Sequence, residues 1–330
     1  MIRLFLALLS IVFIYGGCDM KKTMTMNFPK EYHLEGVAMD EFEPVSNEDG
    51  IFILGDWLMI YQPQGKRLFR FIRMSDTSFS FEAGSRGHGA NEFLNILSTS
   101  INPKNDCEFT LLDNGYLKTV RLQEDGTLTT LSLQKTFEQR PVNGYCQCGE
   151  KYAIAYADCM TGTESDYEYQ IVNLNTRQIR KFSPYPNFHK GGLSQDERCW
   201  FYSKSVVANS SKDLLFSSYS FFPCVRLYER YQVLKKEVYI GSCPQKIDRS
   251  QISYVSGKTC ATDKYVYIVS TLGLQVWNWE AEPIALLHMD REFADFVIDS
   301  PTQTLYTMVF DEENDCYRIY TYHLPSIMAN

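Results

Sequence analysis

The feature that most constrains the fold of this chain is a recurring unit of short strands. Six segments of alternating apolar and polar residues each follow an earlier strand and end in a turn. Their central residues are spaced 43 to 53 residues apart, and the segments are 68–71, 120–122, 171–174, 225–228, 274–277 and 317–320. Four short strands per unit of about 40–50 residues are typical of β-propeller blades.

These units predict an all-β fold, a six-bladed β-propeller with four-stranded blades in a single domain over residues 31–330. Aromatic residues make up 14% of the chain, which favours strands because aromatic side chains pack well on a pleated surface. The last unit is one strand short, and residues 33–39 have no partner in the first unit. We therefore expect this N-terminal strand to close the last blade and remove its exposed edge. The alternatives are a β-sandwich or two smaller all-β domains.

The first seventeen residues have the layout of a secretory signal peptide. Arg3 supplies a positive charge, residues 4–14 are apolar apart from Ser10, and Gly16 and Gly17 place small residues at a cleavage point. The apolar run is short for a bilayer span, although an uncleaved membrane anchor is the alternative. We predict that residues 1–17 are removed on export.

Cys18 follows this segment directly, and Gly16-Gly17-Cys18 resembles the lipobox of bacterial lipoproteins. The resemblance implies a lipidated Cys18, a tether over residues 18–30, and a membrane partner reached through the lipid anchor. The alternative is a nearby cut that leaves Cys18 an ordinary thiol. Of the residues just after the cysteine only Asp19 is acidic, whereas surface-exported lipoproteins of Bacteroidetes carry an acidic run there. We expect an outer-membrane location that faces the periplasm.

Residues 84–93 read GSRGHGANEF. This segment resembles the Gly-x-x-Gly-x-Gly-Pro-Gly-Glu-Phe loop of the TolB-like six-bladed β-propeller lipoproteins of Bacteroidetes, with Ala90 and Asn91 departing from the pattern. In that family the loop joins the first blade to the second, so the resemblance implies the fold and an envelope location but no reaction. The segment lacks the Lys-Ser/Thr pair of a phosphate-binding loop.

Arg86, His88, Asn91 and Glu92 in this loop are the candidate binding residues, because they place polar groups at one face of a propeller. The alternative is structural: Glu92 caps backbone amides and Phe93 packs in the core. Trp200, Tyr202, Tyr219 and Phe221 are aromatic residues that suit either stacking on a ligand or core packing.

No local motif for catalysis is present, so the predicted function is a binding or protein-interaction module of the cell envelope. The ligand class is an envelope protein, a peptide or a glycan, and no cofactor or metal is expected. A net charge of −8 argues against nucleic acid as a partner. The alternative is an enzyme whose site lies at the central channel, either a glycan-directed hydrolase or lyase or a metal-dependent, lactonase-like protein.

Overall fold

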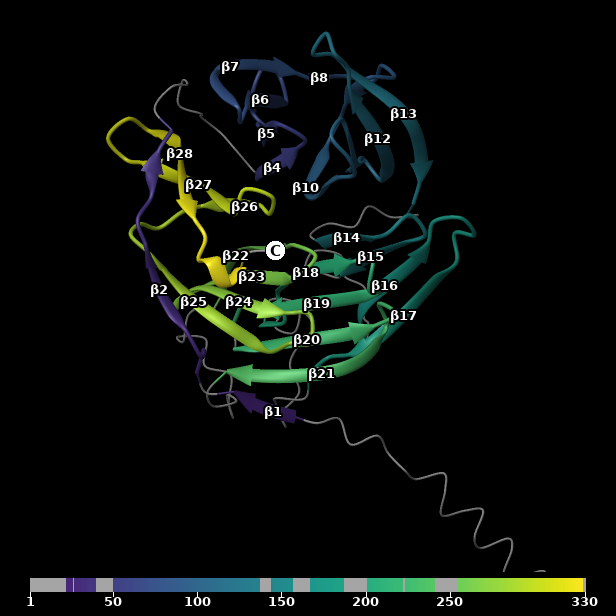
Figure 1. The fold of residues 1–330 in the computed structure, drawn as a ribbon. Helices are drawn as coiled ribbons and strands as arrows, with labels where there is room; N and C mark the ends of the chain where they lie inside the picture. The colour runs from purple at the N-terminus through teal and green to yellow at the C-terminus, as the bar shows by residue number, and fades with distance from the viewer. Residues whose placement is uncertain are drawn as a thin grey trace, which may run out of the picture.

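The computed structural model of the chain is a six-bladed β-propeller (Figure 1). It describes residues 22–25, 27–39, 50–136, 144–156, 167–186, 201–221, 223–240 and 255–328. The predicted signal peptide and Cys18 lie outside these residues. No helix within the described ranges has the length and apolar character needed to cross a membrane.

Each blade is one sheet of antiparallel strands, and the blades follow one another along the chain. The first contains β4 (Gly50–Leu54), β5 (Trp57–Tyr61), β6 (Phe69–Arg73) and β7 (Asp76–Ala83); the second contains β10 (Ile96–Pro103), β11 (Glu108–Asp113), β12 (Tyr116–Leu122) and β13 (Leu128–Lys135). The third contains β14 (Gly144–Cys148), β15 (Tyr152–Tyr156), β16 (Tyr167–Asn173) and β17 (Ile179–Pro184); the fourth contains β18 (Lys204–Asn209), β19 (Leu214–Tyr219), β20 (Cys224–Glu229) and β21 (Val233–Ile240). The fifth contains β22 (Val255–Ala261), β23 (Tyr265–Ser270), β24 (Gly273–Asn278) and β25 (Pro283–Met289); the sixth contains β26 (Asp295–Asp299), β27 (Thr304–Asp311) and β28 (Cys316–His323). The prediction of six four-stranded blades is thus confirmed, with the fourth strand of the last blade supplied from the N-terminus.

The first strand of every blade lies innermost, and these six strands contact one another around the central channel. Because strands alternate in direction, all blade-to-blade connections leave the same end of the propeller, which we call the loop face. The opposite end, where each inner strand turns back into the second strand, is the turn face. Loop 84–95 between the first two blades therefore lies on the loop face, and it contains the short parallel pair β8 (Ser85–Arg86) and β9 (Glu92–Phe93).

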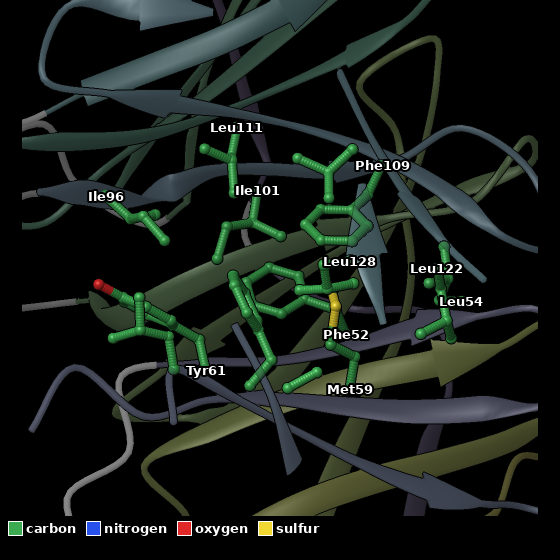
Figure 2. Packing of buried hydrophobic residues seen from close by; sticks show 14 of the residues in the cluster. Phe52, Leu54, Met59, Tyr61, Ile96, Ile101, Phe109, Leu111, Leu122 and Leu128 are labelled. Atoms are coloured by element: carbon green, nitrogen blue, oxygen red, sulfur yellow. The ribbon is translucent and has the colours of Figure 1, made fainter. Parts of the chain in front are cut away.

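The hydrophobic core is divided into layers, one between each pair of neighbouring blades. Figure 2 shows the layer between the first and second blades, where Phe52 and Met59 of the first blade face Phe109 and Leu128 of the second. Similar clusters fill the other interfaces, because both faces of each blade carry buried side chains. The layer between the sixth and first blades joins Ile60 to Met308 and closes the ring.

The N-terminal segment runs along the outer edges of three blades. In chain order, β1 (Lys22–Thr25) pairs parallel with β21, β2 (Glu31–Leu34) pairs parallel with β25, and β3 (Val37–Ala38) pairs antiparallel with β28. The predicted closing strand is confirmed in β3, which supplies the fourth strand of the sixth blade. The strand predicted over residues 33–39 is in fact divided between two blades.

Gly36 is the residue that allows this division. A Cβ atom at Gly36 would lie 2.5 Å from the ring of Tyr322, so only glycine lets the chain pass this close between the fifth and sixth blades. The hydroxyl of Tyr322 donates to Asp290 Oδ1 at 2.8 Å, and the amide of Gly36 donates to the same oxygen at 3.3 Å. The crossing point is therefore fixed by both space and hydrogen bonds.

Deleting residues 31–39 should lower the melting temperature by about 10 °C or more, because it leaves the sixth blade with three strands and exposes the edge of β28. Deleting residues 22–25 is the matched control, because the fourth blade keeps four strands of its own. Differential scanning calorimetry measures both. An equal effect of the two deletions would contradict a closing role for β3.

Candidate functional site

Among the described residues, two hollows have room for a ligand. The larger, about 770 Å³, is the central channel, lined by inner strands of all six blades. The smaller, about 440 Å³, lies between loop 84–95 and the outer part of the second blade; we call it the loop pocket. The channel was a candidate site from the fold, and the loop pocket adjoins the residues predicted from the sequence.

Bulges in two inner strands shape the channel. In β10, the pairing with β11 jumps from Leu97↔Leu112 to Asn102↔Thr110, so residues 98–101 bulge out of the ladder. In β22, the pairing with β23 jumps from Val255↔Ser270 to Thr259↔Ile268, so residues 256–258, which include Lys258, form a second bulge. Bulges re-aim side chains and are common next to functional sites. Here they lie on strands that line the channel, and Ser98, Thr99 and Lys258 are among its lining residues.

Lys258 is held by contacts to the first and sixth blades. Its Nζ donates to the carbonyl oxygen of Ile51 at 2.8 Å and to Asp295 Oδ2 at 3.2 Å, and it lies 4.2 Å from the centre of the Phe52 ring. Asp295 Oδ2 also accepts from the amide of Ile51 at 2.9 Å. Both side chains are partly exposed, at 29% for Lys258 and 12% for Asp295. An ammonium has three donors, so Lys258 keeps one for a ligand.

Lys204, the second lysine of the channel wall, belongs to a buried ionic cluster between the third and fourth blades. Its Nζ bonds Glu168 Oε1 at 2.8 Å, and Arg226 bonds Glu168 at 2.9 Å and Glu237 at 2.7 Å. Tyr219 donates its hydroxyl to both oxygens of Glu168. The two positive charges of this cluster, on Lys204 and Arg226, balance the two negative charges on its carboxylates, as buried charges require. The ammonium of Lys204 therefore serves to hold the third and fourth blades together.

Neutral hydrogen-bonding groups dominate the rest of the channel wall. Hydroxyls and amides come from the second to fifth blades, namely Ser98, Thr99, Asn102, Gln147, Ser203, Ser205, Ser220 and Thr259. Half-buried Tyr156 and Tyr317 add aromatic surface. Asp295 is the one carboxylate among the described lining residues, and its two oxygens accept from Ile51, Lys258 and Phe296. Such a wall suits recognition of a ligand rich in hydroxyl groups.

One form of the enzymatic alternative is a metal-dependent enzyme, which needs a group of metal-binding side chains. Within the described ranges, no three His, Cys, Asp or Glu side chains are grouped as metal ligands would be. The described channel wall thus provides donors and acceptors for hydrogen bonds, together with the one N–H donor of Lys258 that its contacts with Asp295 and Ile51 leave over.

Loop 84–95 owes its shape to Glu92. The Glu92 carboxylate accepts from the amide of Gly89 at 2.8 Å, and a Cβ atom at Gly87 would lie 2.0 Å from Glu92 Oε2. Gly87 has a φ of +155°, which also favours glycine. Phe93 is fully buried and packs edge-to-face on Phe69 at 5.7 Å. The predicted structural roles of Glu92 as a cap and Phe93 as a core residue are confirmed.

The candidate residues of the loop differ in where they lie. His88 and Glu92 line the loop pocket, and both Arg86 and Asn91 are exposed outside its lining. Asn91 Oδ1 accepts from the amide of Thr130 at 2.8 Å, which ties the loop to the outer strand of the second blade. Binding by these four residues stays a prediction.

Beneath the loop pocket lies a buried ion pair. Lys118 Nζ lies 2.8 Å from Asp113 Oδ2 and donates to the carbonyl oxygen of Glu92 at 2.6 Å. Asp113 Oδ1 accepts from the amides of Leu94 and Asn95. The rim of the pocket carries exposed apolar side chains, namely Leu94, Tyr116, Leu131 and Leu133.

The aromatic candidates are mostly core residues. Tyr202 and Tyr219 are buried, and Phe221 packs against the same cluster. Trp200 lies outside the described residues. The channel residues were missed from the sequence, because bulges in two inner strands place them and neither bulge follows a local motif.

Comparison of this chain with known proteins identifies its fold but assigns it to no family. No protein-family model matches this chain, and no curated protein matches it. Among solved structures, the chain is similar to a DUF4221-family protein of Bacteroides vulgatus, with 10% identity, 88% of this chain and 98% of that chain covered, and a TM-score of 0.54. A Bacteroides fragilis protein described as exported has 12% identity, coverages of 92% and 100%, and a TM-score of 0.54. The calcium-binding protein regucalcin from Agrobacterium tumefaciens has 9% identity, coverages of 90% and 97%, and a TM-score of 0.53. At these identities the similarity establishes a shared propeller fold.

Gly87→Ala should lower the free energy of unfolding by about 1–3 kcal/mol, because the new methyl group collides with the Glu92 carboxylate. In a Glu92→Ala background the same change should cost less, since the carboxylate is gone. Gly115→Ala is the control, because Gly115 has a φ of +84° and nothing within 4 Å of an added Cβ. Urea unfolding of the four proteins and the control measures this coupling. Equal costs of Gly87→Ala in both backgrounds would show that Glu92 does not shape the loop.

Proposed function

We propose that this protein is an exported, lipid-anchored binding protein of the cell envelope that takes a carbohydrate ligand in its central channel. The observation that carries the proposal is the channel wall, where hydroxyl and amide side chains line the same cavity as the partly exposed side chain of Lys258. Sugars are bound by such polar groups together with aromatic rings, which Tyr156 and Tyr317 supply. The positive charge at Lys258 favours sugars that carry a carboxylate.

The proposed location rests on the N-terminal sequence. We infer from it a signal peptide over residues 1–17, lipidation at Cys18, and an outer-membrane location that faces the periplasm. The similar Bacteroides fragilis structure is described as exported, which agrees with this location. The lipid anchor makes the membrane itself one partner of the protein.

We also propose kinship with the TolB-like propeller lipoproteins. The glycine-rich loop 84–93 lies between the first and second blades, which is its place in that family. The similar DUF4221-family protein comes from Bacteroides, in agreement with a Bacteroidetes origin for this kind of chain.

The enzymatic alternative shares the same channel. Regucalcin is described as a calcium-binding protein and has the same fold, but its similarity to this chain extends to the fold alone. In the described part of this chain the channel carboxylate, Asp295, is engaged by Ile51 and Lys258. Binding is therefore the better-supported function, and the experiment below distinguishes it from turnover.

Isothermal titration calorimetry of the processed chain, from residue 18 onward with Cys18→Ser, tests the proposal against a panel of neutral and acidic oligosaccharides. We expect an acidic member to bind and Lys258→Met to weaken it about tenfold or more, as loss of a charge-assisted hydrogen bond predicts. Thr99→Val removes a hydroxyl that lines the channel on the bulge of β10, and it leaves the Lys258–Asp295 ion pair intact. We therefore expect this variant to weaken binding as well.

Arg86→Ala and His88→Ala are the controls, since neither residue lines the channel. If these loop variants weaken binding while Lys258→Met and Thr99→Val leave it unchanged, the site is the loop pocket. Failure of every oligosaccharide to bind would contradict the proposed ligand class. Release of cleaved sugar from any member would establish the enzyme instead.

A further inference from the structure

The direction of β1 indicates from which end of the propeller the N-terminal chain arrives. β1 runs parallel to β21, with Lys22 opposite Glu237 and Thr25 opposite Ile240. Since β21 runs from the turn face to the loop face, Lys22 is the end of β1 nearer the turn face of the fourth blade. Cys18 precedes Lys22 by four residues, a length of chain that reaches at most about 14 Å.

The turn-face side of the third and fourth blades is basic. Its exposed basic side chains lie on the hairpin turns and on the first residues of the outer strands β17 and β21; they are Lys151, Arg177, Arg180, Lys181, Lys212, Arg230 and Lys235. We call this surface the basic rim. Three acidic residues accompany it, namely Glu150, Asp213 and Glu229.

Three other blades carry the opposite sign on their turn-face side. The corresponding turns of the first, second and fifth blades carry more acidic than basic residues, among them Asp56, Asp106, Glu124, Asp125, Asp263 and Glu280. The whole chain has a net charge of −8, so the basic rim is a local reversal of the protein's charge. This reversal coincides with the blade on which the N-terminal chain arrives.

Two exposed aliphatic side chains lie within the basic rim. Ile179 and Val233 are the first residues of β17 and β21, and they are 42% and 57% exposed. The two blades are joined here, because the Tyr152 and Tyr231 rings are 6.3 Å apart and Gly149 lies beside Ser210. Basic side chains around exposed aliphatic ones are typical of surfaces that lie on anionic lipid.

We propose that the basic rim is a membrane-docking surface for anionic phospholipid headgroups, with Ile179 and Val233 entering the interface. The proposal rests on the lipid anchor at Cys18 proposed above, which holds this side of the propeller within reach of the bilayer. One acyl anchor and one basic surface together bind membranes far more stably than either does by itself. The loop face, with loop 84–95, then points away from the membrane.

Vesicle co-sedimentation tests the docking surface without the lipid. The processed chain with Cys18→Ser is mixed with vesicles of phosphatidylcholine, or of phosphatidylcholine with 30% phosphatidylglycerol, about a third being an ordinary anionic content for such assays. We expect about tenfold tighter binding to the anionic vesicles at low salt, and loss of this preference at high salt. Arg180→Glu, Lys181→Glu and Lys212→Glu together should abolish the preference. Ile179→Thr with Val233→Thr should weaken binding severalfold and leave its salt dependence in place.

The matched control reverses three exposed basic residues toward the loop face, Lys66→Glu, Arg67→Glu and Lys135→Glu, and changes the net charge equally. An equal loss in this control, or equal binding of wild type to both vesicles, would overturn the docking surface. Mass spectrometry of the full chain purified from membranes reports acylation of Cys18 separately. A chain without acyl groups that still prefers anionic vesicles would contradict the lipid anchor and leave the docking surface standing.

Discussion

The structure depends on one constraint: each blade has two apolar faces, and a neighbour must cover both. Five interfaces arise as successive blades stack along the chain, but the sixth needs the first and last blades to meet. Ile60 and Met308 pack in that last layer, and Val37 and Ala38 complete the sheet of the sixth blade. Closing a ring also removes two exposed sheet faces and shelters a strand edge, which protects a β protein from aggregation.

Closure also determines where function can reside. The inner strands form the wall of a single cavity, so their side chains come from segments far apart in the sequence. Lys258, Asp295 and the backbone of Ile51 illustrate this, because they join three blades at one point. The same contacts that hold the ring together leave Lys258 partly exposed to the channel. In the proposed binding site, the same residues therefore also hold the blades together.

The repeat of short strands was sufficient to predict the blades, since strand period and turns are local properties of the sequence. The structural roles of Glu92 and Phe93 were also foreseen as one alternative, because glycine-rich loops mostly serve backbone geometry. The channel was foreseen as a place for a site but its residues were not, since residues 98–101 break the two-residue period only when β10 is paired with β11. The division of residues 31–38 between two blades depends on Gly36 meeting Tyr322, a contact distant in sequence.

Hydrogen–deuterium exchange of the processed domain, with and without its tightest oligosaccharide, tests most directly the claim that the channel is the binding site. We expect slower exchange in β10 around residues 98–101 and in β22 around residues 258–261, with loop 84–95 unchanged. Protection confined to loop 84–95 and the outer strand β13 would contradict it and place the ligand in the loop pocket.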